Sequence, residues 1–244
     1  MIGKCRLCRK EKPLIEAHIL ARSILEVLQS TAGSLMSISK DVESHPKRLP
    51  TGSYDKEILC ADCDGIFSPW ENYTAELLYK VAGKYRAKGT TWFYFIPDYD
   101  YVKLKLCVLS ILWRMSISNR PEFRNVTLSP EHENELRELI LAKDPGPPDR
   151  FSVAWMQLSD HIGTRSVLGT SRSVQTQQKI YNLGLPGFIA IIKVGIDHIR
   201  HPFQGVIMAP DKPLFVGLKE NRLEDDWKPT FHKLWKKEQK KKRR

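Results

Sequence analysis

The sequence predicts an α+β fold, in which a cysteine-rich module of about residues 1–90 precedes a body over residues 91–227. Three observations predict it. Two C-x2-C pairs stand in the first quarter of the chain, and apolar residues recur at helical spacing over 66–85 and 101–118. After residue 151, short apolar runs separated by Gly, Pro and Asp are typical of an antiparallel sheet.

The cysteine pairs predict a structural zinc site. Cys5 and Cys8 form the first pair and Cys60 and Cys63 the second, with 51 residues between them. Four thiolates satisfy a closed tetrahedral zinc site. Because no signal peptide or membrane span is evident, we expect a cytoplasmic protein, in which reduced thiols bind metal rather than pair as disulfides. The fifth cysteine, Cys107, lies in an apolar run and is expected in the core.

The net charge of +11 suggests a polyanionic partner, but the charge is concentrated at one end. Residues 228–244 carry nine Lys or Arg and a single Glu, a net of +8, so the remainder carries only +3. Such a basic tail suits sequence-independent binding to a phosphate backbone. A solvated helix end that aids solubility explains the tail equally well.

In the module, the segment from Pro13 to His18 is expected to form part of a hairpin, followed by a helix over residues 19–28. Residues 30–56 are rich in Ser, Gly, Pro and Lys and are expected to form an insertion loop between the halves of the zinc site. The run Ser68–Glu71 matches a capping box. The next helix therefore either begins at the second cysteine pair and kinks, or starts afresh at Pro69.

The body is predicted to begin with a strand over residues 90–97. Asp100 is expected to cap a helix over 101–118, which is apolar nearly all round and so belongs in the interior. Ser129 is expected to open a second helix. The predicted strands of the antiparallel sheet lie in residues 151–158, 188–194, 205–209 and 214–218.

The chain resembles the HNH, or ββα-metal, endonucleases, which are built on a treble-clef zinc knuckle. The resemblance rests on Cys5, Cys8, His18 and the run Cys60–Asp64, and covers about the first 75 residues. The later chain, especially residues 105–118, is similar to uncharacterised bacterial HNH proteins. In that family the two cysteine pairs hold zinc, a hairpin histidine activates water, and the residue after the last cysteine binds a catalytic cation.

The resemblance implies that His18 is the general base and that Asp64 holds the catalytic cation. Glu16, which shares a face with His18 if the segment is extended, and Asn72 are weaker candidates. Many family members have Asp directly before the histidine, where this chain has Ala17, and His or Asn is more usual at the position of Asp64. A carboxylate suits Mg²⁺ or Mn²⁺. Two alternatives stay open: a histidine bonded to backbone at a helix start, and an acid that merely favours the helix dipole.

These features predict a metal-dependent endonuclease that hydrolyses phosphodiester bonds in DNA, with RNA as an alternative substrate. Its expected cofactors are structural Zn²⁺ and catalytic Mg²⁺ or Mn²⁺. One alternative is a zinc module that binds nucleic acid without cleaving it, because the usual Asp is absent at Ala17. Another is a nuclease subunit of a phage-defence assembly, whose body docks on a protein partner or a second copy.

Overall fold

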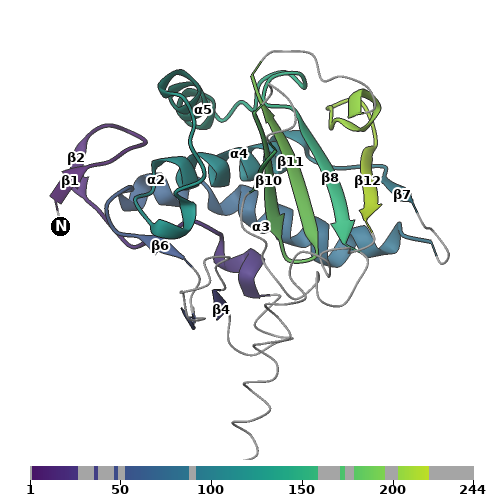
Figure 1. The fold of residues 1–244 in the computed structure, drawn as a ribbon, viewed down its shortest axis with the longest axis horizontal. Helices are drawn as coiled ribbons and strands as arrows, with labels where there is room; N and C mark the ends of the chain where they lie inside the picture. Colours follow the sequence, from purple (N-terminus) through teal and green to yellow (C-terminus); the bar gives the residue numbers. More distant parts are fainter. Residues whose placement is uncertain are drawn as a thin grey trace, which may run out of the picture.

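The protein combines helices with several sheets, so the predicted α+β class is confirmed (Figure 1). The predicted basic tail lies outside the described residues, as does most of the predicted insertion loop. Within the described part, no helix is long and apolar enough to cross a membrane. The computed structural model describes residues 2–26, 36–37, 47–48, 53–87, 92–158, 171–173, 179–195 and 203–219.

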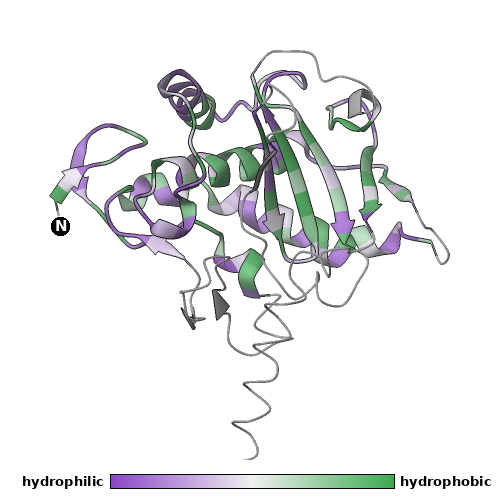
Figure 2. Ribbon diagram, in the orientation of Figure 1, coloured by the Kyte–Doolittle hydropathy of each residue, from purple (hydrophilic) through white to green (hydrophobic). Residues whose placement is uncertain are grey.

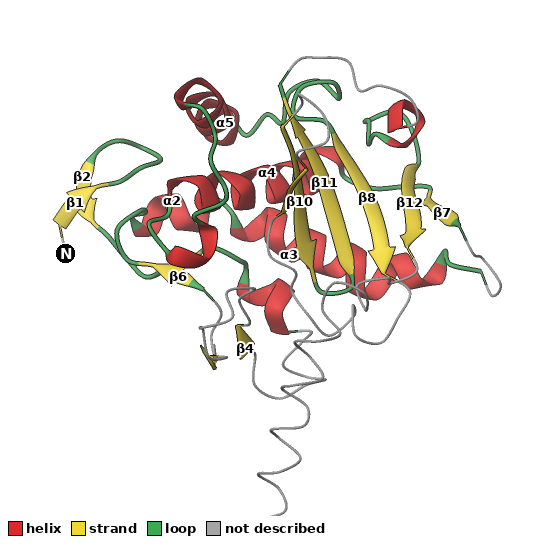
Figure 3. Ribbon diagram, viewed as in Figure 1, coloured by secondary structure: helices red, strands yellow, loops and turns green. Residues whose placement is uncertain are grey.

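The largest sheet has six strands in the order β7-β12-β8-β11-β10-β9 (Figure 3). All neighbouring pairs are antiparallel except β12 and β8, which run parallel, so the expectation of a purely antiparallel sheet is wrong at this pair. The strands are β7 (Phe93–Ile96), β8 (Val153–Leu158), β9 (Ser171–Ser173), β10 (Lys179–Leu185), β11 (Phe188–Val194) and β12 (Leu214–Lys219).

Two strand expectations in the body need correction. Residues 205–209 do not form a strand, because a 3-10 turn occupies η5 (Phe203–Val206) and only Ile207 bridges to Ala154. Conversely, β10 was not expected from the sequence. Asn182 and Gly184 interrupt its apolar pattern, yet this strand pairs along its whole length with β11.

Helices α3 (Ser68–Glu76) and α4 (Tyr101–Ile117) pack on each other and lie along one face of the sheet (Figure 1). The predicted cap of α4 is confirmed, since the Asp100 carboxylate accepts a hydrogen bond from the Lys103 N–H at 2.9 Å. The Ser129 hydroxyl likewise accepts from the His132 N–H at the start of α5 (Pro130–Ala142). The chain leaves α3 through η1 (Leu77–Val81), a π-helical turn, and η2 (Ala82–Lys84).

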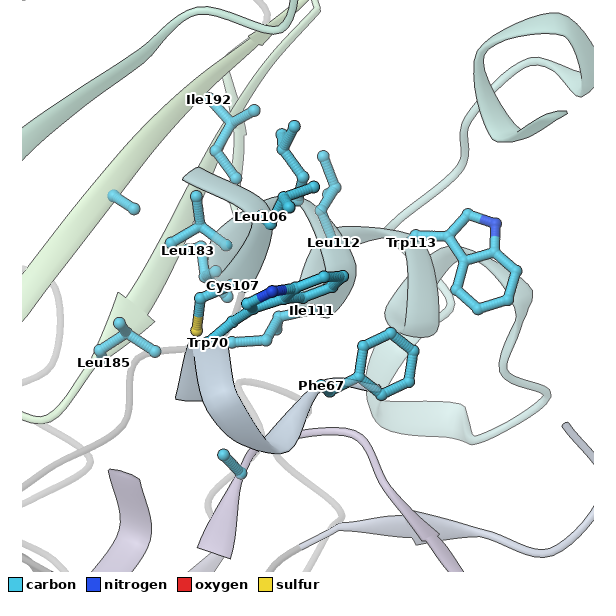
Figure 4. Close-up of a cluster of buried hydrophobic side chains, with 14 of the residues drawn as sticks. Phe67, Trp70, Leu106, Cys107, Ile111, Leu112, Trp113, Leu183, Leu185 and Ile192 are labelled. Atoms are coloured by element: carbon cyan, nitrogen blue, oxygen red, sulfur yellow. The ribbon is translucent and has the colours of Figure 1, made fainter. Parts of the chain in front are cut away.

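The core lies between these helices and the sheet. As its all-round apolar sequence predicts, α4 is buried over most of its length, and Cys107 is fully buried. Figure 4 shows this thiol close to Trp70 of α3, with Leu183 and Leu185 of β10 on the sheet side. Burial raises the pKa of Cys107 to about 12, which makes this cysteine an inert core residue.

The start of α3 differs from the predicted capping box. Ser68 is the first helical residue, Phe67 holds the N-cap position, and no side chain caps the helix. Both expected features are present: α2 (Ala61–Gly65) begins at the second cysteine pair, and α3 begins again beside Pro69. Ile66 and Phe67 between them keep helical backbone angles. Glu71 makes no capping bond because its carboxylate pairs with an arginine of α4.

The module contains short strands joined to the body by polar contacts. The described part of the predicted 19–28 helix is helical over residues 22–26. From α5, the Arg137 guanidinium donates to the carbonyl oxygen of Leu7 at 2.8 Å. The antiparallel pairs are β1 (Ile2–Lys4) with β2 (Glu11–Pro13), β3 (Ala17–His18) with β6 (Tyr54–Asp55), and β4 (Met36–Ser37) with β5 (Lys47–Arg48).

A buried lysine anchors the turn that follows α5. Lys105 of α4 is completely buried, and its Nζ lies 2.8 Å from the carbonyl oxygens of Pro147 and Arg150 and 3.0 Å from the Tyr101 hydroxyl. These acceptors match the three N–H bonds of an ammonium group. Burial nevertheless lowers the pKa of Lys105 to about 7, against the opposing effect of the Asp149 carboxylate.

We predict that Lys105→Met lowers the free energy of unfolding by about 2–4 kcal/mol, because buried acceptors lose their donor. The effect should grow with pH above about 7. The unfolded lysine keeps its proton up to about pH 10.5, whereas the folded one releases it near 7, so folding is favoured as pH rises through this window. Urea denaturation of the wild type and of Lys105→Met at pH 7 and at pH 9 measures the difference in unfolding free energy. A difference that is the same at both pH values would contradict the lowered pKa of Lys105.

Candidate functional site

The four cysteines of the two pairs come together in space. The Sγ atoms of Cys5, Cys8, Cys60 and Cys63 all lie within 4.8 Å of one another. Four sulfurs bound to one zinc ion at about 2.3 Å would be about 3.8 Å apart, so the cluster has the size that zinc requires. Across the described residues, no other group of three or more His, Cys, Asp or Glu has this compactness. The predicted metal-binding cysteines are therefore confirmed as one candidate metal centre.

The first cysteine pair lies inside a hairpin turn. We expected it to precede the hairpin; instead, Cys5 and Cys8 stand between β1 and β2, because Lys4 pairs with Glu11 and the chain reverses between them. The Arg9 N–H donates to the carbonyl oxygen of Cys5 at 2.8 Å, and Arg9 adopts a left-handed φ of 61°. This tight reversal points both thiols to the same side.

The second pair begins a helix, as expected. Cys60 is the N-cap residue of α2 and Cys63 lies in its first turn. Two bonds hold this helix start against the hairpin: the Arg6 N–H donates to the Ile58 carbonyl at 2.8 Å, and the Cys60 N–H points to Cys5 Sγ at 3.5 Å. Burial raises the pKa of the Cys63 thiol, and the adjacent thiols raise it further. A bound cation would reverse this preference, because metal displaces the thiol protons.

His18 and Asp64 lie close to this centre on two different elements. His18 ends β3, where it pairs with Tyr54 of β6, and Asp64 follows Cys63 in α2. Both side chains are half-buried. Burial raises the pKa of the Asp64 carboxyl, whereas the nearby positive charges of Arg114 and His18 lower it. The two predicted residues are therefore within electrostatic range of each other.

Arg114 of α4 completes a group of charged residues that we call the polar cluster: His18, Asp64, Glu71 and Arg114. Its side chain is only 1% exposed. One guanidinium nitrogen donates to the Glu71 carboxylate at 2.5 Å and another to the His18 carbonyl oxygen at 2.7 Å. The guanidinium carbon also lies 4.4 Å from the ring centre of Phe67. Arg114 thus connects β3, α3 and α4 at the edge of the candidate site.

Sequence reasoning missed Arg114 and Glu71, although a signal was present. A single arginine closes the apolar run Leu106–Trp113 in a helix that is buried nearly all round. A guanidinium in such a position needs a buried acceptor, because an isolated buried charge is very costly. Glu71, which we read as part of a capping box, is that acceptor.

The weaker candidates lie apart from the polar cluster. Glu16 is exposed and forms an ion pair with Lys56 at 2.6 Å. Asn72 is exposed and lines a hollow between α3 and the helical residues 22–26. Ala17 is fully buried and pairs with Asp55. Within the described residues, the ring of His18 makes no hydrogen bond to backbone.

Comparisons with protein-family models, with curated proteins and with solved structures give no match to this chain. The geometry of the cysteine centre and of the polar cluster therefore carries the functional argument.

We predict that the purified protein contains about one zinc ion per chain, which Cys60→Ser removes because three thiolates hold zinc far less tightly than four. Elemental analysis by mass spectrometry measures the metal content. Cys107→Ala is the matched control, since this cysteine is buried in the core and is not part of the four-cysteine cluster, so this variant should keep the metal. Equal zinc in both variants would show that the four cysteines do not form the site.

We predict that Arg114→Met costs about 3–5 kcal/mol of unfolding free energy, because the Glu71 carboxylate stays behind with little solvent and no partner. The double variant Arg114→Met with Glu71→Leu should recover much of this loss, since it removes both charges. Chemical denaturation of the single and double variants measures the coupling. Strictly additive losses would mean that the ion pair is not the source of the effect.

Proposed function

We propose that the protein is a metal-dependent endonuclease of the HNH type that hydrolyses phosphodiester bonds in DNA. One observation carries the proposal: a half-buried histidine and a half-buried aspartate lie within electrostatic range of each other beside a four-cysteine centre. A metal centre that holds two chain segments together, with a histidine base and a carboxylate beside it, is a suitable arrangement for hydrolysis of a phosphodiester bond.

The order of the elements supports the family assignment. Strands β3 and β6 pair with each other, and α2 follows them with two of the four cysteines at its start. A β-β-α unit of this kind, closed by zinc, is what the resemblance to treble-clef HNH proteins implies. His18 occupies the strand and Asp64 the helix, as the resemblance requires.

His18 is proposed as the general base. An imidazole accepts a proton near neutral pH, and its transfer from a water molecule generates the nucleophile for attack on phosphorus. Pairing of β3 with β6 fixes the backbone at this position, and Arg114 donates a hydrogen bond to the His18 carbonyl oxygen. These two contacts fix the backbone that carries the ring.

Asp64 is proposed as the residue that would hold Mg²⁺ or Mn²⁺; such a cation would supply charge neutralisation at the leaving oxygen. Burial disfavours an isolated carboxylate at this position, and a bound cation would remove that penalty. The Arg114 guanidinium is engaged by Glu71 and so leaves the Asp64 carboxylate oxygens for the metal.

A second function, binding of nucleic acid without cleavage, is favoured by one observation. Ala17 is buried at the position where many family members carry an additional acidic ligand. A site with one carboxylate ligand binds a divalent cation weakly, because affinity follows the number of charged oxygens. In this case the cysteine centre would serve binding alone.

We predict that the protein nicks supercoiled plasmid in the presence of Mg²⁺ or Mn²⁺ and that His18→Ala lowers the rate by about 10²–10⁴-fold, the usual worth of a general base. His132→Ala is the matched control, because His132 is a similarly half-buried histidine on α5, outside the polar cluster. Gel electrophoresis of the plasmid over time measures both rates. Cleavage that His18→Ala leaves unchanged would exclude the proposed base.

We also predict that Asp64→Asn raises the Mn²⁺ concentration needed for half-maximal cleavage at least tenfold, because the ligand loses its charge. Asp62→Asn is the control in the same helical turn, since that carboxylate is exposed and pairs with Lys12 instead. A titration of metal against cleavage rate gives the value. Plasmid retardation without cleavage, in wild type and variants alike, would favour the binding function.

A further inference from the structure

Strand β7 lies at one end of the six-stranded sheet and has an unusual edge (Figure 3). Its neighbour among the described residues is β12, which pairs with it antiparallel from Phe93 opposite Gly217 to Ile96 opposite Leu214. On the other side, the described part of the chain offers β7 no partner. An unpaired edge of this kind is a template for another strand.

The exposed side chains along this edge are aromatic. Phe93 is 45% exposed and Phe95 49% on one face of the strand, whereas the alternating Tyr94 and Ile96 are buried on the other face; Trp92, just before the strand, is 78% exposed. Phe215 of β12 joins this group: its ring stacks on that of Phe93 at 5.1 Å between centres and meets that of Phe95 edge-on at 5.6 Å. We call these four residues, Trp92, Phe93, Phe95 and Phe215, the aromatic edge. Figure 2 shows that hydrophobic residues also run along β12.

The register determines which backbone groups face outward. The Leu218 N–H donates to the Trp92 carbonyl oxygen at 2.7 Å, which identifies Trp92 and Leu218 as a hydrogen-bonded pair. Such pairs alternate along an antiparallel ladder, so Tyr94 and Ile96 also bond towards β12. The N–H and C=O groups of Phe93 and Phe95 therefore point away from the sheet.

The aromatic edge lacks the features that keep exposed strands apart. Residues 89–96 contain no charged side chain and no proline, the devices that usually protect an edge. The three exposed rings offer roughly 350 Å², if a large aromatic side chain can bury about 200 Å². This is nearly half of the about 800 Å² that each partner buries in a stable complex, before any flanking residue is counted.

The charge of this surface indicates what covers it. A net charge of +8 out of +11 lies in residues 228–244, whereas the aromatic edge itself carries no charge, so two copies can meet there without repulsion between like charges. A nucleic acid would need cations for its phosphates, whereas residues 89–102 contain no Lys or Arg and include Asp98 and Asp100. A neutral strand with outward-facing backbone groups suits another copy of itself.

We propose that β7 is the interface of a homodimer, in which it pairs antiparallel with β7 of a second copy about a two-fold axis perpendicular to the sheet. The N–H and C=O groups of Phe93 and Phe95 bond to those of the second copy, and the sheet continues through both molecules. This axis keeps the two aromatic edges on the same face, where the phenylalanine rings meet across the new strand pair. The inference does not depend on the proposed nuclease activity.

Analytical ultracentrifugation of the full-length chain tests the proposal. The wild type is expected to sediment at micromolar concentration with twice its chain mass of 28.2 kDa. The double variant Phe93→Lys with Phe95→Lys should be monomeric, its dissociation constant raised at least about 100-fold, because two central aromatic anchors become like charges. Val102→Lys is the matched control, since Val102 is exposed on α4 and should leave the dimer intact.

Hydrogen exchange separates this interface from any other. On dilution of the wild type below its dissociation constant, the amides of Phe93 and Phe95 should exchange faster, whereas those of Tyr94 and Ile96 should not change. The double variant should have the same circular dichroism spectrum and the same zinc content as the wild type, which would establish that it folds. A monomeric wild type, a dimer that survives both lysines, or Phe93 and Phe95 amides whose exchange does not change on dilution would each overturn the proposal.

Discussion

The N-terminal module depends on the approach of two cysteine pairs that are far apart in sequence. Strands β3 and β6 have only two residues each and α2 has five, so backbone hydrogen bonds and local propensity stabilise little. The four sulfur atoms lie where the turn of the first hairpin meets the start of α2. A metal ion there would add to the packing of buried residues such as Leu7, Ile19 and Leu59, and would fix the strand of His18 relative to the helix of Asp64.

Arg114, which belongs to the body, also holds the candidate site in place. Because α4 is buried nearly all round, the guanidinium cannot reach water and is instead satisfied by Glu71 and by the His18 carbonyl. The buried guanidinium of Arg114 therefore connects the body to the strand that carries His18. Contacts from α5 to the first hairpin add a second link, as the bond from Arg137 to Leu7 shows. The candidate site is thus held by both parts of the chain.

The sequence predicted local features better than distant pairings. Asp100 and Ser129 cap their helices as expected, because the cap is decided within four residues. The direction of β12 beside β8 could not be predicted, since apolar runs do not encode strand direction. The partner of Glu71 was missed for a related reason. Arg114 lies 43 positions away in sequence, whereas the capping-box pattern around Glu71 suggested a local role for its carboxylate. The cysteine centre was predictable because metal chemistry constrains spacing as strongly as residue type.

The position of Arg114 along the chain also affects how the protein matures. All four cysteines precede residue 64, so a metal ion that binds them can do so while the body is still being synthesised. Arg114 of α4, which donates hydrogen bonds to the His18 carbonyl oxygen and the Glu71 carboxylate, is synthesised some fifty residues later. Binding of a metal ion by the four cysteines would therefore be separate from completion of the polar cluster, and a chain truncated before α4 would keep the cysteines without the bonds of Arg114.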